Sequence, residues 1–199
     1  MRALIIFIKN PDLGKVKTRL AQDIGDEKAL AIYNDLLAHT KNVSLKTLAD
    51  KVFVFHFPTL INHNLWKGNI FENRVQAEGD LGAKMSDAIN QVVLDGYQEV
   101  CLIGSDCFEI TEAHINSAFE SLAENDVVIG PAKDGGYYLL GQQKLHYQIF
   151  DKMPWSKSNL LNKTQMVLTV NGINYKLLEV LSDVDHIEET TVLLFQDIK

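Results

Sequence analysis

The chain has 199 residues, of which 46% are hydrophobic and 23% charged, and it carries a formal net charge of -7. This length and composition are typical of a single globular domain, which we assign to residues 1–199. The acidic balance argues against a general nucleic-acid binder, because such proteins need a broad basic face to displace counterions. No apolar run approaches the roughly 20 residues that span a bilayer, so we expect no transmembrane segment.

The two cysteines, Cys101 and Cys107, are not spaced as a CxxC pair and are too few for a disulfide framework. We therefore expect reduced thiols in a cytoplasmic protein. Nothing in the sequence indicates an oligomeric state.

Strands and helices alternate in the first part of the chain. Residues 3–8 form a continuous apolar run that predicts a buried strand. Asp26 is a candidate N-cap for a helix that places apolar side chains at helical spacing from residue 27. Residues 51–57, rich in Val and Phe, predict a second strand, whereas residues 59–73 are compatible with a loop or a short helix.

The clearest helix lies between Asp80, its expected N-cap, and Gly96, which suits its C-terminal end. The same patterns predict further strands and helices down the chain. The strands are expected at residues 99–103, 126–129, 137–140 and 175–181, and the helices at 112–123, 156–167 and 187–195.

This alternation predicts βαβ units and a three-layer α/β/α domain with a mainly parallel, mixed sheet. In such sheets ligands bind beyond the carboxyl ends of the strands. Four polar or glycine-rich segments directly follow predicted strands. These segments are residues 9–20, 104–107, 130–138 and 182–186. We therefore expect them to meet at one edge of the sheet.

The first of these segments, within FIKNPDLGKVKTRL, concentrates basic residues in an acidic chain. A P-loop is excluded, because its pattern would need glycine at Lys9 and serine or threonine at Val16. Pro11 and Gly14 can shape a turn from which lysine and arginine side chains wrap a di- or triphosphate. A solvated surface loop is the alternative.

Acidic side chains follow two other predicted strands. Asp106, preceded by Gly104 and Ser105, could hold Mg²⁺ or Mn²⁺, since Mg²⁺ takes one or two protein carboxylates and completes its shell with phosphates and water. A helix cap or an Asx turn is the alternative. Asp183 and Asp185 share one face of an extended segment, so one could complete the metal site and the other cap the last helix. The alternative is that both simply cap the helix or form a turn.

Two adjacent glycines, Gly135 and Gly136, follow Asp134 and precede Tyr137. They suit a sharp turn or a close approach of the backbone to a ligand, and Asp134 could act on an acceptor hydroxyl or phosphate. A plain hairpin turn with a core tyrosine is the alternative. Trp155 could stack on a base or sugar, or simply pack against the protein.

In this order, the segments resemble the bacterial glycosyltransferase-like family of small nucleotide-diphospho-sugar transferases, which has the GT-A type of α/β fold. The pattern F-x-K-x-P-x-x-G-x-V-K-T-R-L is matched over residues 7–20, and G-P-A-x-D-G-G-Y-Y-L-x-G over residues 130–141. GDLGAKM, GSDCF and DVDH are similar to three further motifs. The chain is more distantly similar to 2-phospho-lactate guanylyltransferase and the molybdenum-cofactor nucleotidyltransferases.

The resemblance implies that Lys9, Lys17 and Arg19 hold nucleotide phosphates and that Asp106 is the metal carboxylate, with Asp185 as its partner. The full set of residues expected to bind the nucleotide is Lys9, Pro11, Gly14, Lys17, Arg19, Lys84, Gly104 and Ser105. Those expected on the acceptor or sugar side are Asp134, Gly135, Gly136, Tyr137 and Trp155. The departures from the family pattern are Lys84 for arginine, Phe108 for proline and His186 for threonine.

We therefore expect a transferase that uses Mg²⁺ or Mn²⁺ and a nucleotide-activated donor, with Asp106, Asp134 and Lys17 as catalytic residues. Glycosyl transfer from a nucleotide-diphospho-sugar to a small-molecule acceptor is the first hypothesis. The second is nucleotidyl transfer from a nucleoside triphosphate to a phosphorylated acceptor, with pyrophosphate release. The third is a nucleotide-binding module that has lost catalysis, for which Phe108 and His186 are the only support.

Overall fold

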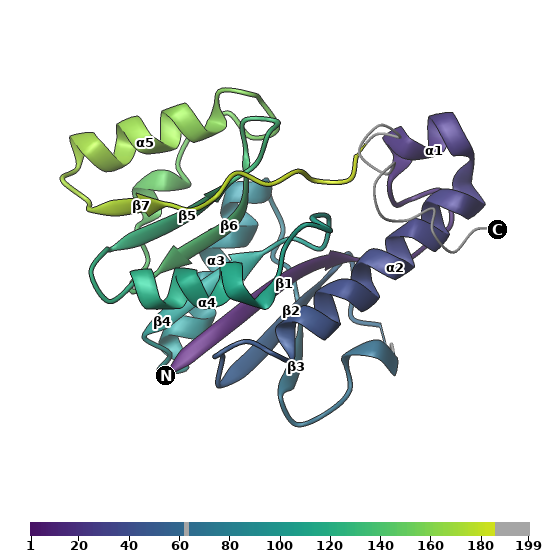
Figure 1. Ribbon diagram of the computed structural model, residues 1–199, viewed down its shortest axis with the longest axis horizontal. Helices are drawn as coiled ribbons and strands as arrows, with labels where there is room; N and C mark the ends of the chain where they lie inside the picture. Colours follow the sequence, from purple (N-terminus) through teal and green to yellow (C-terminus); the bar gives the residue numbers. More distant parts are fainter. Residues whose placement is uncertain (62–63, 186–199) are drawn as a thin grey trace.

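The computed structural model describes residues 1–61 and 64–185, which contain one continuous sheet (Figure 1). Its strands are β1 (Arg2–Lys9), β2 (Lys51–Phe57), β3 (Phe71–Val75), β4 (Glu99–Ile103), β5 (Val127–Pro131), β6 (Tyr137–Gln142) and β7 (Tyr175–Leu177). They lie in the order β3-β2-β1-β4-β6-β5-β7. β6 is antiparallel to β4 and β5, whereas every other pair is parallel. The predicted mainly parallel, mixed sheet is confirmed.

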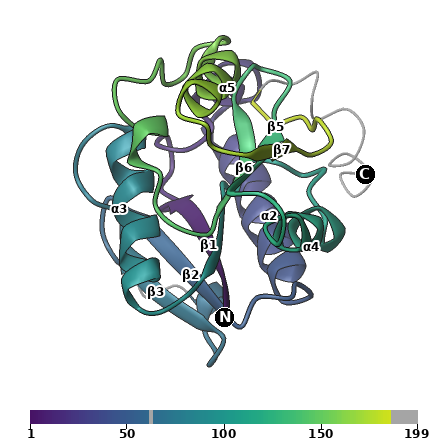
Figure 2. The same cartoon turned by 90° about the vertical axis from the view of Figure 1, so that its left-hand side faces the viewer.

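Helices cover both faces of this sheet. They are α1 (Thr18–Ile24), α2 (Asp26–Ser44), α3 (Leu81–Leu94), α4 (Glu112–Ser121) and α5 (Leu160–Val170), together with the short 3₁₀ helices η1 (Asn64–Trp66) and η2 (Tyr147–Ile149). Figure 2 shows α2 and α4 on one side of the sheet and α3 on the other. In the described part of the chain, no helix is both long and apolar enough to cross a membrane.

The continuous apolar run of β1 is explained by its position in the sheet, where helices cover it on both faces. Leu4 and Ile6 pack into the core with α2 and α4, whereas Ala3 and Ile5 pack into the core with α3 and α5. All four side chains are fully buried. A strand covered on both faces loses the polar alternation of a half-exposed strand, and this is why the run could be recognised as central.

The structure differs from the sequence predictions at three places. The basic segment, expected as a loop as far as residue 20, already becomes helical at Thr18, and Gly25, with φ of 87°, is the N-cap of α2 in place of Asp26. Residues 59–73, expected as a loop or a short helix, do contain the short helix η1, but their last three residues begin an edge strand, β3, which pairs with β2. The predicted strand at 175–181 forms a regular strand only as far as Leu177. Beyond it, Leu181 forms a single isolated bridge with Ala132.

Other boundaries agree more closely. Asp80 caps α3, since its Oδ1 accepts a hydrogen bond from the backbone of Ala83 at 2.9 Å, and Gly96 follows the helix with φ of 95°. The helix predicted at 156–167 begins at Leu160. The helix predicted at 187–195 lies outside the described residues. Both cysteines are buried free thiols.

Candidate active site

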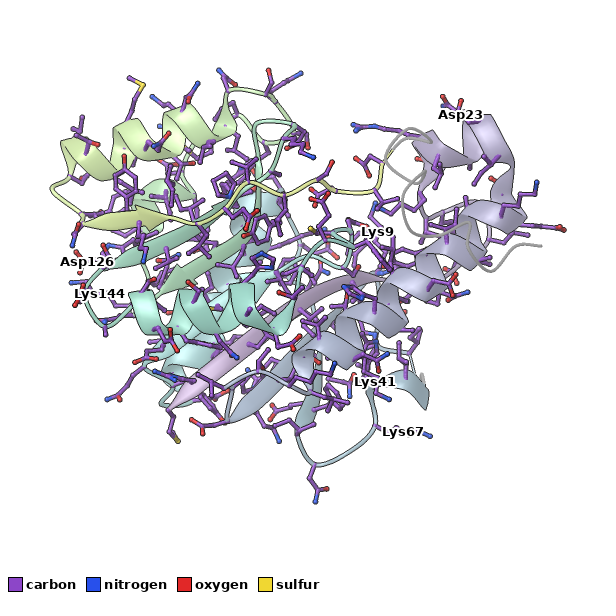
Figure 3. All side chains as sticks on the ribbon, viewed as in Figure 1. Lys9, Asp23, Lys41, Lys67, Asp126 and Lys144 are labelled. Carbon is purple, nitrogen blue, oxygen red and sulfur yellow. The ribbon has the colours of Figure 1, made fainter. Side chains whose placement is uncertain are left out.

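The carboxyl ends of β1, β4 and β5 meet at one edge of the sheet, and a pocket of about 590 Å³ lies there. This volume is within the usual range for sites that bind small molecules and cofactors. Figure 3 shows Lys9 at this edge, whereas Asp126 and Lys144 lie at the opposite end of the sheet. The arrangement follows the rule that loops at strand carboxyl ends form the ligand site of an open α/β sheet.

Lys17 lies between two carboxylates that are far apart in the sequence. Its Nζ is 2.6 Å from Oδ1 of Asp106 and 3.3 Å from Oδ1 of Asp185. Arg19 extends the cluster, with Nη1 3.2 Å from Oδ2 of Asp185. The side chain of Lys17 is only 4% exposed, compared with 49% for Asp106 and 41% for Asp185. The predicted cationic loop and the predicted metal carboxylates therefore form one cluster.

The backbone and the charge of Lys17 are both unusual. The residue precedes α1 in the left-handed conformation, with φ of 46° and ψ of 43°, which is uncommon for a residue other than glycine. Burial by itself would lower the pKa of Lys17, but the attraction of Asp106 and Asp185 outweighs it and raises the pKa above its usual value. The ammonium group thus stays charged at neutral pH.

Tyr33 of α2 joins two of the strand ends. Its Oη accepts a hydrogen bond from the backbone N–H of Lys9 at 2.8 Å and donates one to the carbonyl of Lys9 at 3.0 Å. Oγ of Ser105 lies 3.4 Å from the same oxygen. Sequence reasoning missed this role, because a tyrosine among apolar helix residues has the pattern of an ordinary core side chain.

The segment that carries Asp185 is attached to the Asp106 loop. The backbone N–H of Val184 donates to the carbonyl of Asp106 at 2.9 Å, and the buried Val184 side chain packs with α1 and α2. Phe108 packs against the same cluster and stacks on His39 with ring centroids 4.5 Å apart. Phe108 is not part of the pocket lining. This departure from the family pattern therefore faces the helices.

Asp183 lines the pocket on the same segment. Burial, together with the charges of Asp106 and Asp134, raises the pKa of its carboxyl to about 7. Asp183 is thus unlike Asp185, which lies in ion pairs with Lys17 and Arg19. The helix that one of these two residues was expected to cap lies outside the described residues.

The glycine-rich segment is the turn of the β5–β6 hairpin. Asp134 Oδ1 accepts a hydrogen bond from the backbone of Gly136 at 2.8 Å, and both residues line the pocket. Gly135 has φ of 90°, and a side-chain carbon there would lie 2.0 Å from the carbonyl oxygen of Ser158. The close approach that requires Gly135 is therefore to another part of the same chain.

Trp155 both packs and lines the pocket. The edge of its indole lies against the start of α3, where a side-chain carbon on Gly82 would be 2.4 Å from Cζ2. Lys84 points elsewhere, with Nζ 3.6 Å from the centre of the Phe57 ring. The departure at Lys84 therefore lies outside the pocket lining.

Most of the residues singled out from the sequence meet in the pocket. The lining includes Lys9, Lys17, Arg19, Gly104, Ser105, Asp106, Asp134, Gly136, Tyr137, Trp155 and Asp185. The residues outside the lining are Pro11, Gly14, Lys84 and Gly135. Of these, Gly14 has φ of 73° and so shapes the basic loop from outside the pocket.

A divalent cation fits this cluster if a ligand supplies further oxygens. One ammonium already lies within ion-pair distance of both Asp106 and Asp185, so the two carboxylates face the same point. Within residues 1–61 and 64–185, no group of three or more His, Cys, Asp or Glu side chains could hold a metal by itself. Two carboxylates combined with phosphate oxygens match the preference of Mg²⁺.

Solved structures share this architecture, which is that of the nucleotide-diphospho-sugar transferases. A protein from Desulfovibrio desulfuricans G20, provisionally described as a nucleotide-diphospho-sugar transferase, is 29% identical with a TM-score of 0.86, covering 93% of this chain and 82% of that one. A CMP:2-keto-3-deoxy-manno-octonic acid synthetase complexed with CTP is 11% identical with a TM-score of 0.59, covering 93% of each chain. Rv0371c of Mycobacterium tuberculosis H37Rv, in complex with manganese, is 10% identical with a TM-score of 0.55, covering 95% of each chain.

The chain belongs to the DUF2064 family, whose description is "Uncharacterized protein conserved in bacteria". The family model matches residues 40–157. This range contains Asp106 and Asp134 but neither Lys17 nor Asp185. None of the curated proteins compared with the sequence matches it significantly.

Proposed function

We propose that this protein is a divalent-cation-dependent transferase that moves the sugar of a nucleotide-diphospho-sugar to a small-molecule acceptor. The observation that carries the proposal is the cluster of Lys17, Asp106 and Asp185 at the carboxyl edge of the sheet. In this cluster, a cation that could bind a diphosphate lies in contact with two carboxylates that could bind a metal ion. The likeness to the Desulfovibrio protein, at 29% identity, favours sugar transfer.

The residues divide by charge into two groups. Lys9, Lys17 and Arg19 are proposed to bind the phosphates, since each lines the pocket and guanidinium and ammonium groups pair with phosphate oxygens. Asp106 and Asp185 would hold Mg²⁺ or Mn²⁺. When bound, this ion neutralises negative charge on the diphosphate as it leaves.

The chain itself would contribute positioning and electrostatic stabilisation, which together provide much of the rate in phosphate chemistry. Gly104 and Ser105, which line the pocket beside Asp106, are proposed to form its donor side. Asp134, held by the backbone of Gly136, is proposed to accept the proton of the acceptor hydroxyl, with Tyr137 and Trp155 forming the adjacent wall.

Nucleotidyl transfer is the second candidate. The three cations Lys9, Lys17 and Arg19 in one pocket suit a triphosphate at least as well as a diphosphate. In that reaction a phosphorylated acceptor attacks the α-phosphate and pyrophosphate leaves. A module without catalysis is less favoured, because Phe108, one of its two supports, lies against α1 and α2 and outside the pocket lining.

A ligand screen followed by product analysis tests the proposal. Nucleotides and nucleotide sugars are added with Mn²⁺ or with EDTA, and the unfolding temperature is recorded, because a ligand at 100 times its Kd adds about 2.7 kcal/mol of apparent stability. Candidate acceptors are then added with the donors that bind. Release of a nucleoside diphosphate identifies sugar transfer, and release of pyrophosphate identifies nucleotidyl transfer.

Asp106→Asn is the matched variant for this screen. We expect it to remain folded and to lose the Mn²⁺-dependent rise in unfolding temperature, because it lacks one of the two proposed metal carboxylates. Asp151→Asn, at an exposed position outside the pocket, serves as the control. A full Mn²⁺-dependent response in Asp106→Asn would show that Asp106 does not hold the cation.

A further inference from the structure

We propose that the ammonium of Lys17 and a divalent cation exclude each other between Asp106 and Asp185, so that the site takes the cation together with polyphosphate rather than the free cation. The inference rests on the proposed function for the identity of the phosphate ligand. It adds an order to the binding steps and gives Lys17 two alternative sets of partners.

The position of Lys17 carries the first step. Nζ is 2.6 Å from one carboxylate and 3.3 Å from the other, so it occupies the space that an ion touching both would need. Metal–oxygen distances for Mg²⁺ are about 2.0–2.1 Å. Two cations within the same pair of carboxylates would overlap and repel each other. The cation therefore binds only when the ammonium has moved.

The burial of Lys17 carries the second step. Its side chain is 4% exposed, so an ammonium that gave up both carboxylates without a new partner would be left buried and uncompensated. Lys9 and Arg19, which line the same pocket, would attract a polyphosphate to the neighbourhood of Lys17. The polyphosphate then supplies oxygens for the displaced ammonium while the cation takes the carboxylates.

The position and the length of the Lys17 side chain permit the ammonium to exchange the carboxylates for phosphate. Lys17 stands at the junction of the basic loop and α1, and Figure 1 shows the segment after β7 running toward α1 at this edge. Four rotatable side-chain bonds allow Nζ to move without unwinding the helix. Polyphosphate and cation should consequently bind with positive cooperativity, since each removes an obstacle to the other.

Mn²⁺ binding to the full chain tests the exclusion directly. The free ion is measured by its electron paramagnetic resonance signal, without any phosphate, for the wild type, Lys17→Met and Lys15→Met. We expect Lys17→Met to bind Mn²⁺ about tenfold more tightly than the wild type, because the competing charge is removed. Lys15, in the same loop but 75% exposed and paired with Asp12, is the matched control and should leave the affinity unchanged.

Two further variants secure the interpretation. Lys17→Gly removes the same charge and also accepts the left-handed backbone, so it replaces Lys17→Met if that variant does not fold. Adding Asp106→Asn to either variant should abolish the gain in Mn²⁺ affinity. Persistence of the gain in the double variant would place the ion elsewhere and overturn the inference, as would Mn²⁺ affinities in Lys17→Met and Lys17→Gly no higher than that of the wild type.

Inorganic tripolyphosphate separates this inference from the proposed function, because it carries the phosphates without a base or sugar. By titration calorimetry, Mn²⁺ should tighten its binding to the wild type, and Lys17→Met should reduce this binding about tenfold. If no variant bound tripolyphosphate while Lys17→Met still gained Mn²⁺ affinity, the exclusion would be supported, whereas the proposed binding of phosphates by Lys9, Lys17 and Arg19 would be refuted. Tripolyphosphate binding to the wild type that is unaffected by Mn²⁺ would overturn the cooperative step.

Discussion

Tyr33 offers a sharp test of how the strand ends are joined. Tyr33→Phe removes one oxygen from a side chain that is only 3% exposed. The backbone N–H of Lys9, now 2.8 Å from that oxygen, would lose its partner, and the carbonyl of Lys9 would lose a donor at 3.0 Å. Both hydrogen bonds are partly buried, and a typical hydrogen bond contributes about 0.5–1.5 kcal/mol. We therefore expect the free energy of unfolding to fall by about 2 kcal/mol.

Urea denaturation followed by circular dichroism measures this loss. With a slope of about 2 kcal/mol per molar urea, the midpoint should drop by about 1 M. Tyr147→Phe removes the same atom from a side chain that is 65% exposed and should shift the stability by less than about 0.5 kcal/mol. If the two variants lost equal stability, the hydrogen bonds of Tyr33 would not be what joins α2 to the end of β1.

Two further predictions concern the hairpin turn and Asp183. Gly135→Ala should lower the free energy of unfolding by about 3 kcal/mol or more, because its new side-chain carbon would meet the Ser158 carbonyl. Gly172→Ala is the control: its φ is 63° with open space around it, so it should cost only about 1–2 kcal/mol of backbone strain. Equal losses of stability in urea denaturation would contradict the close contact between Gly135 and Ser158. Because the folded state raises the pKa of Asp183 to about 7 from 3.8, folded protein holds its proton more tightly and stability should fall as pH rises between 4 and 7. In EDTA buffers, the wild type should lose about 1 kcal/mol per pH unit over this range relative to Asp183→Asn, and parallel pH profiles would refute the raised pKa.

The buried strands of the fold could be predicted because their sequences reflect burial on two faces. β1 and β4 were recognised at nearly their observed bounds for this reason. β3 was not, since it is an edge strand in which Phe71 is its only buried side chain. α1 was also missed, because it is only seven residues long and lies between the basic loop, with its proline and glycine, and Gly25.

The candidate site was predictable to the level of which segments meet, and no further. Parallel strand ends place Lys17, Asp106 and Asp185 at one edge whatever the details of their loops. The contact of Lys17 with both carboxylates depends on a left-handed backbone and on side-chain directions, neither of which has a local signal at a lysine. The need for a glycine at 135 likewise comes from Ser158, whose proximity no sequence spacing reveals.

The ion-pair cluster also has a consequence for synthesis of the chain on the ribosome. Lys17 and Asp185 are 168 positions apart, so the cluster cannot form until the segment after β7 has left the exit tunnel. At rates of about 5–20 residues per second, Lys17 is synthesised roughly ten seconds or more before its second carboxylate. During that interval the ammonium has only Asp106, and then only once β4 has emerged. Ligand capture by the nascent chain would therefore report the emergence of Asp185, while the early strands are already able to pair.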